Sequence, residues 1–88
     1  MDFRRIERVA KGFANHRRVQ IMNLLEKKPD LSVFEISREL GVNFKTISEH
    51  LRRLAHANLV LKRNIGSEVE HVLTHSGKII LKFLRTLE

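Results

Sequence analysis

Residues 41–59 read GVNFKTISEHLRRLAHANL, in which a tight turn leads into one amphipathic helix. The opening glycine suits the left-handed conformation that ends a helix, and Asn43 is a residue type that caps the start of the next one. Ile47, Leu51 and Leu54 recur at three- and four-residue steps, so they share a face that must be buried. The opposite face is polar and basic. A helix that presents short polar and basic side chains, held from behind by aliphatic packing, is suited to entering the major groove of DNA.

Two amphipathic helices are expected before the turn, over residues 2–13 and 16–28, each with one apolar stripe. Gly12 interrupts the first pattern, Asn15 is suited to cap the second helix, and Pro29 ends it. The apolar stripe of the first helix is large for an element at the end of a chain.

A helix-turn-helix is predicted from the next residues. Ser32 is followed three positions later by Glu35, which is a capping-box signature, so a third helix is expected over residues 33–40. A turn of about three residues then leads to the recognition helix at about 44–57. Caps, turn length and apolar spacing all agree with this motif.

The pattern changes after Asn58 to two β-prone runs, LVLKRNI and EVEHVLT. Gly66-Ser67 joins them as a glycine-first pair suited to a type II′ turn. A hairpin over about residues 59–74, directly after a recognition helix, is a wing. The continuous apolar run at its start leaves open which face of the first strand points inward. Thr74 is suited to cap a final helix over residues 75–87 with a broad apolar face.

Length and charge limit the function. Eighty-eight residues predict one domain over positions 1–88, mainly α with a small β-hairpin (α+β): a winged helix-turn-helix of four helices, a two-stranded wing and a C-terminal helix. The net charge of +7 favours a polyanionic partner such as double-stranded DNA. No apolar run approaches a membrane span of roughly 20 residues, so a cytoplasmic protein without a membrane partner is expected. The chain has no cysteine, no catalytic constellation and no cofactor motif, so neither an enzyme nor a cofactor is expected.

With these elements in place, the chain resembles the ArsR/SmtB type of winged-helix transcriptional regulator over nearly its whole length. The most diagnostic piece is TISEHLRRL after the Gly-Val-Asn turn, with the Gly-turn hairpin and LTHSGK downstream. The resemblance implies a homodimeric repressor that reads two operator half-sites. Metal-sensing members place two cysteines where this chain has Ser32 and Phe34, which argues against metal binding there. His71 and His75 form the closest histidine pair in sequence, but no third ligand follows at a zinc-site spacing.

The resemblance also implies dimerisation through the first and last helices. The sequence gives an independent reason, because both terminal helices carry more apolar surface than a small monomer easily covers. The residues expected at the dimer interface are Phe3, Ile6, Val9, Phe13, Ile79, Ile80, Phe83, Leu84 and Leu87.

The residues expected to face DNA come from the family motif, the outer face of the recognition helix and the tip of the wing. They are Asn43, Phe44, Lys45, Thr46, Ser48, Glu49, His50, Arg52, Arg53, Lys62 and Arg63.

Their expected roles differ. Lys45 would reach a guanine edge or a phosphate, and Thr46 a thymine methyl. Phe44 would touch a thymine methyl or instead pack beside Val42 or Leu40. Glu49 would accept from cytosine N4 or instead pair with Arg52 or Arg53, three and four residues further on.

The wing residues Lys62 and Arg63 would follow a phosphate backbone or the minor groove. The basic residues near the N-terminus are interpreted as solvated surface rather than as a site: Arg4, Arg5, Arg8, Arg17 and Arg18. Two alternatives stay open for the whole domain, namely a winged-helix protein-interaction module and a non-specific architectural DNA binder.

Overall fold

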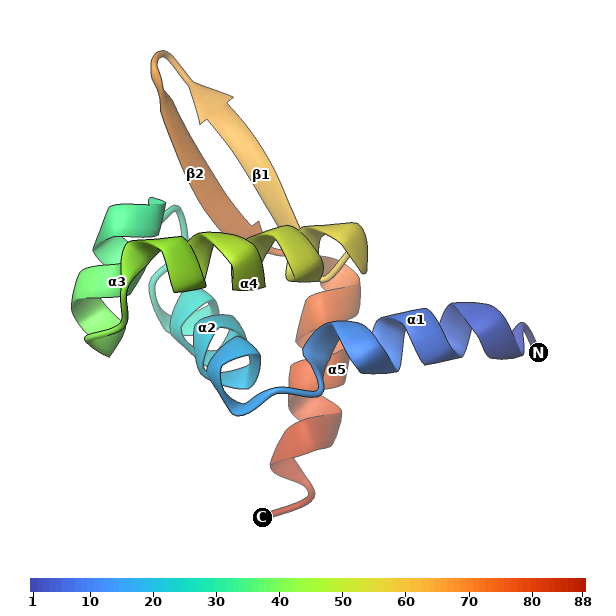
Figure 1. Cartoon of the computed structure of the whole chain (residues 1–88). Coiled ribbons are helices and arrows are strands. Elements are labelled where there is room, and N and C mark those ends of the chain that lie inside the picture. The colour runs from blue at the N-terminus through green and yellow to red at the C-terminus, as the bar shows by residue number, and fades with distance from the viewer.

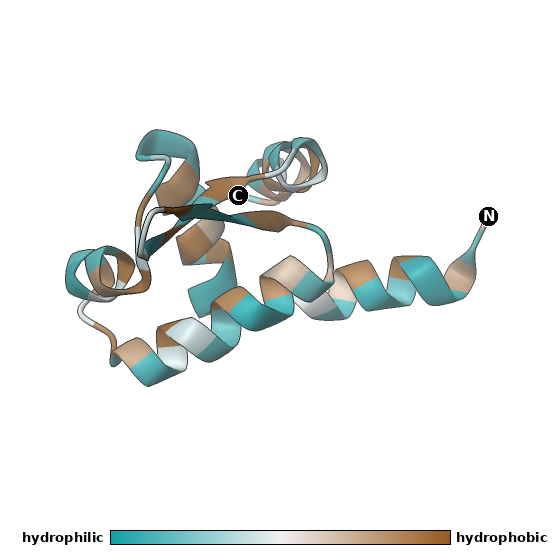
Figure 2. Cartoon of the chain, turned by 90° about the horizontal axis from the view of Figure 1, so that it is seen from above, coloured by the Kyte–Doolittle hydropathy of each residue, from teal (hydrophilic) through white to brown (hydrophobic).

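A computed structural model describes residues 1–88 and contains five helices and one antiparallel hairpin (Figure 1). The elements follow the order α1 (Phe3–Phe13), α2 (His16–Lys27), α3 (Val33–Leu40), α4 (Phe44–His56), β1 (Val60–Ile65), β2 (Glu68–Leu73) and α5 (His75–Arg85). The predicted winged helix-turn-helix is therefore confirmed. Figure 1 shows the hairpin rising from the helical body, and in both ribbon views α1 projects outward to the N-terminus (Figure 2).

Several predicted helix ends differ from the structure by one or two residues. The first helix starts one residue later, because Asp2 is its cap, and the second stops at Lys27. The recognition helix ends at His56, and the last helix at Arg85 instead of at position 87. Gly12 does not interrupt α1, which continues through it to Phe13.

Local capping chemistry explains where the helices begin. The Asn15 side chain accepts from the backbone N–H of Arg17 at 2.9 Å, and Ser32 and Glu35 form the predicted reciprocal capping box. Asn43 caps α4. Gly41, at φ 64°, has the left-handed conformation that ends α3. Each of these bonds satisfies a backbone group that the first or last turn of a helix leaves free.

The hairpin has a regular register, from Val60 opposite Leu73 to Ile65 opposite Glu68. Gly66 has a positive φ, as the first position of a type II′ turn requires. The side chain of Val60 points inward and is buried, whereas Leu61 is 51 % exposed, which settles the inward face of β1. Leu31 forms an isolated bridge to β2, so the segment before α3 is attached to the wing.

The core is aliphatic and lies between the helices and the base of the wing. Its fully buried members come from α2, α3 and α4 and from the hairpin base: Ile21, Met22, Leu25, Ile36, Ile47, Leu51, Leu54 and Leu59. Burial of a large aliphatic side chain contributes about 1.5 to 3 kcal/mol to the free energy of unfolding. This core fixes α4 against α2 and α3, and so fixes the direction in which its outer face points.

Two glycines let backbones approach closely. A Cβ built at Gly12 would lie 2.4 Å from the Cβ of Ala57, so α1 contacts the C-terminal end of α4. A Cβ at Gly77 would lie 2.3 Å from the carbonyl oxygen of Leu59, which places the first turn of α5 against the chain that leaves α4. Beside it, the Thr74 hydroxyl donates to the Asn58 carbonyl at 2.8 Å and accepts from the Gly77 N–H at 2.9 Å. No larger residue fits at either glycine without displacing its neighbour.

Candidate nucleic-acid interface

The N-terminal turn of α4 is held in place from behind and is open in front. Ile47 and Leu51 bury the inner face, and the Asn43 side chain accepts from the Lys45 backbone N–H at 2.8 Å. The side chains of Lys45 and Thr46 are exposed and make no hydrogen bond or ion pair within the chain. These two donors are therefore free to meet a base edge or a phosphate. Ser48 is also exposed.

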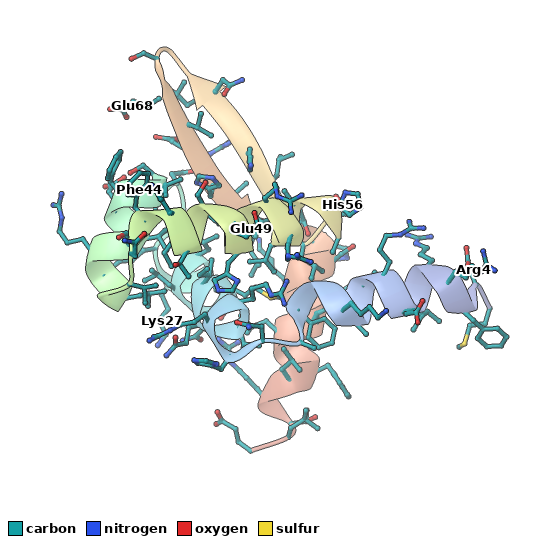
Figure 3. All side chains as sticks on the ribbon, in the orientation of Figure 1. Arg4, Lys27, Phe44, Glu49, His56 and Glu68 are labelled. Atoms are coloured by element: carbon teal, nitrogen blue, oxygen red, sulfur yellow. The ribbon has the colours of Figure 1, made fainter.

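Glu49 lies in the middle of the outer face of α4 (Figure 3) and forms ion pairs with Arg52 and Arg53. Arg52 donates to both carboxylate oxygens of Glu49, at 3.0 and 2.6 Å, and Arg53 donates to one of them at 3.3 Å. The hydrogen bonds from Arg52, together with the charge of Arg53, lower the pKa of Glu49 to about 2. Of the two roles expected for Glu49, the structure has the ion pairs. Oε1 accepts two of these bonds and Oε2 only one, so one acceptor site on Oε2 is left for a base.

Phe44 has a packing partner within the chain that was not expected. Its ring stacks on Phe34 of α3, with centroids 5.1 Å apart and planes at 25°. Packing beside Val42 or Leu40 was expected as the alternative to DNA contact, and that expectation missed a partner ten residues away. Phe44 is 41 % exposed and Phe34 63 % exposed, so the stacked pair is still open to solvent on the helix-turn-helix surface. Aromatic pairs of this kind contribute about 0.5 to 1.5 kcal/mol beyond the area they bury.

His50 is less accessible than its neighbours on α4. It is half-buried, and its Nδ1 is buried without a hydrogen-bond partner. Burial, together with the charge of Arg18, lowers the pKa of the imidazole. His50 is therefore less freely available to DNA than the exposed Lys45 and Thr46.

The two basic residues of the wing have different surroundings. Lys62 is exposed on β1 opposite His71, whereas Arg63 forms an ion pair with Asp30 in the segment before α3. Asp30 holds a left-handed backbone conformation at φ 67°. Together with the bridge from Leu31, this ion pair attaches the wing to the body of the domain. Figure 3 shows the acidic Glu68 near the tip of the wing.

The expected dimer residues gather along α1 and α5 and leave an apolar groove between them. The groove has a volume of about 460 Å³ and is lined by Ile6, Val9, Ala10, Phe13, Ile80 and Phe83 with Asp2 and Arg5 at its edge. Phe3, Ile79 and Leu87 are more than half exposed, and Leu84 is half-buried on another side of α5. Contiguous exposed apolar surface of this kind marks an interaction site.

The structure also shows features that sequence reasoning missed. Arg8 and Arg18, interpreted as solvated surface, line one hollow with Arg52 and Arg53 of α4. The spacing of Arg8 and Lys11 on one face of α1 was a signal for this grouping, but the partner helix was not evident from the chain. His71 is buried, with its Nδ1 at 2.9 Å from the Leu31 carbonyl.

No three side chains among the histidines and carboxylates gather closely enough to hold a metal ion, and His75 is exposed while His71 is buried. None of the five helices has the length and apolarity that crossing a bilayer demands.

A model of the family described as "Bacterial regulatory protein, arsR family" matches residues 15–62, which is just over half of the chain. No curated protein matches the sequence. Among solved structures, HlyU from Vibrio cholerae is 30 % identical, with 99 % of this chain and 97 % of that chain covered and a TM-score of 0.82. The transcriptional regulator HlyU from Vibrio vulnificus is 31 % identical, with 93 % and 85 % covered and a TM-score of 0.76.

A third solved structure is a homodimeric winged helix-turn-helix DNA-binding domain from Mycobacterium bovis, a possible ArsR-family transcriptional regulator. It is 27 % identical, with 94 % of this chain and 77 % of that chain covered and a TM-score of 0.85.

Proposed function

This chain belongs to the arsR family of bacterial regulatory proteins, and from that premise we propose that it is a homodimeric repressor that inserts α4 into the major groove. The observation that carries the proposal is the state of the first turn of α4. Lys45 and Thr46 are exposed and unbonded on a helix whose back is fully buried and whose start is capped. A rigid helix with free donors at its N-terminal end is the geometry of direct base readout.

The dimer follows from the apolar groove between α1 and α5. A second copy would cover the exposed apolar residues of both helices, and two-fold symmetry would present two copies of α4 to one face of DNA. Half-sites about one helical turn apart, roughly 34 Å, are then expected. The homodimeric domain from Mycobacterium bovis supports this assembly.

Selection from a random library of DNA duplexes tests the function. We expect enrichment of a symmetric motif, and an affinity that falls about 10³ to 10⁵-fold between 50 and 200 mM salt if 6 to 10 phosphates are contacted. Tight binding without an enriched motif would identify an architectural binder. A folded protein that binds no duplex would identify a protein-interaction module.

Lys45→Ala tests the assignment to α4. Loss of one base contact should weaken binding to the selected operator by roughly 1 to 3 kcal/mol and relax the preference at one base pair. Lys27→Ala is the matched control, because Lys27 is exposed at the far end of α2. Equal operator affinities for the two variants, measured by fluorescence anisotropy, would refute the role of Lys45.

A further inference from the structure

A basic hollow of about 320 Å³ lies where α1, α2 and α4 meet. Figure 1 shows the C-terminal half of α1 alongside the C-terminal half of α4, with α2 next to both. Six of its eight lining residues are basic, and they come from three helices: Arg8, Lys11, Arg18, Arg52, Arg53 and His56. The hollow adjoins the outer face of α4 but is separate from the first turn that carries Lys45.

Close packing of two backbones builds this hollow. Its remaining lining residues are Gly12 and Ala57, the pair through which α1 contacts the end of α4. A Cβ at Gly12 would also lie 3.9 Å from the carbonyl oxygen of Arg53. Because glycine has no Cβ, α1 comes close enough to place Arg8 and Lys11 beside the arginines of α4. The grouping therefore depends on the fold and not on flexible side chains alone.

The positive charges in the hollow exceed the negative charges that face them. Arg52 and Arg53 share one carboxylate, that of Glu49, and Lys11 pairs with Glu7 on its own helix, whereas Arg8 and Arg18 have no ion pair. The Nε of Arg18 is buried without a hydrogen-bond partner, and burial together with the charge of Arg53 lowers the pKa of this guanidinium. Like charges held close together repel each other, and a bound anion would relieve this repulsion.

We propose that the hollow binds a phosphate group of the DNA backbone, beside the C-terminal half of α4. This inference rests on the proposed function, because it assumes that the outer face of α4 meets DNA. Arg52 and Arg53 belong both to that face and to the hollow. A DNA backbone that contacts the outer face of α4 is therefore within reach of the hollow. Arginine is suited to this role because its planar fork donates two parallel hydrogen bonds to a phosphate.

The hollow and the apolar groove lie on different faces of α1. An α-helix turns about 100° per residue, so Arg8 and Lys11 lie on the side of α1 opposite to Val9 and Phe13. Val9 and Phe13 line the apolar groove against α5, and Arg8 and Lys11 line the hollow against α4. One face of α1 thus contributes to the dimer groove, and the opposite face contributes to the hollow. A dimer would carry two hollows.

The double variant Arg8→Gln/Lys11→Gln tests this site in the full chain. Both residues are exposed, so folding should be unaffected. The matched control is Lys78→Gln/Lys82→Gln, which removes the same charge from exposed positions on α5 that do not line the hollow. Affinities are measured at several salt concentrations for the duplex selected by the wild-type protein and for a scrambled duplex.

We expect the hollow variant to bind both duplexes about tenfold more weakly than the control and to reduce the slope of log K against log salt by about two, one phosphate per protomer. The ratio of the affinities for the selected and the scrambled duplex should stay unchanged, whereas Lys45→Ala should lower this ratio. A slope equal to that of the control would overturn the site while leaving the proposed function intact, provided that the wild type still selects a motif. A wild type that selects no motif and binds no duplex would overturn both.

A titration with inorganic phosphate alone tests whether the hollow binds a free anion instead of a phosphate of DNA. Amide signals of Gly12 and Ala57 are followed by NMR as phosphate is added to the wild type and to the hollow variant. We expect at most weak binding, because the hollow is open to solvent and a single free anion lacks the rest of the backbone. Saturable phosphate binding that the variant loses, with an unchanged DNA salt slope, would show a free-anion site and overturn the assignment to DNA.

Discussion

At the scale of single residues, Glu49 sets the charge that α4 presents to its partner. Its carboxylate holds two guanidiniums, and with a pKa of about 2 it is ionised at neutral pH. A carboxylate on a DNA-facing helix repels phosphates, yet here it also orders Arg52 and Arg53. Its net effect on binding is therefore a balance between repulsion and alignment.

Glu49→Gln should tighten binding to DNA of any sequence several-fold and steepen the salt dependence, because it removes one negative charge and releases two guanidiniums toward phosphates. Glu88→Gln, at the exposed end of the chain, is the control for net charge. Affinities of both variants for operator and scrambled duplexes give the answer. Weaker operator binding with lost preference for one C·G pair would instead show that Glu49 accepts from cytosine.

His71 gives the domain a pH dependence of a defined sign. Burial, with a smaller contribution from the charge of Lys62, lowers the pKa of its imidazole, and the bond to the Leu31 carbonyl only partly offsets this. The unfolded chain takes up a proton near the ordinary pKa of about 6.5, while the folded chain does so only at lower pH. The contribution of neutral His71 to the free energy of unfolding is therefore fully present above pH 6.5. This contribution is lost as the pH falls from there through the folded pKa.

Urea unfolding of the wild type between pH 7.5 and 5 should show this loss, and His71→Leu should show a shallower one. The comparison removes the contribution of His50, whose pKa is also lowered and which both proteins keep. The variant loses the Nδ1 hydrogen bond and starts from a lower free energy of unfolding, so the slopes and not the absolute values are compared. Equal slopes would assign the pH dependence to other groups.

At the scale of elements, α4 is stabilised by what lies behind it. Leu51→Ala should lower the free energy of unfolding by roughly 2 to 5 kcal/mol, because it opens a cavity in a core position that is 1 % exposed. Leu61→Ala on β1 is the matched control: its side chain is 51 % exposed and should cost far less. Chemical denaturation measures both. Similar losses for the two variants would mean that α4 is not packed as the structure has it.

The elements were predictable because their signals are local. Asn15, Asn43 and Thr74 cap helices from the position directly before each helix, and the capping box of Ser32 needs only its own first turn. The period of apolar residues similarly requires only one helix. Errors were confined to helix ends and to the interruption expected at Gly12, a glycine that serves packing inside α1.

The candidate site was predictable only in part, because its contacts join distant positions. The ion pair of Glu49 spans three residues and was anticipated as one of two roles. The stacking of Phe44 on Phe34 and the bond of Arg63 to Asp30 join separate elements, which no local pattern announces. Likewise, the hollow exists only because Gly12 meets Ala57 across the fold.

At the scale of the whole molecule, the apolar groove between α1 and α5 sets the assembly. Phe83→Glu should convert the proposed dimer to monomer, because it places a charge in the groove. Ile65→Glu on the wing is the control, since Ile65 is 54 % exposed and Phe83 is 55 % exposed. Sedimentation gives the mass and circular dichroism verifies folding. A folded Phe83→Glu variant that keeps the wild-type dimer mass would exclude this interface.

The joint at Thr74 has a mechanical consequence. Its hydroxyl links the Asn58 carbonyl to the first turn of α5, and Gly77 packs against the Leu59 carbonyl. These contacts attach α5 to the end of α4, so the two helices are expected to move as one rigid unit. In the proposed dimer, the distance between the two α4 helices is then set by the interface between the protomers and not by bending within a protomer.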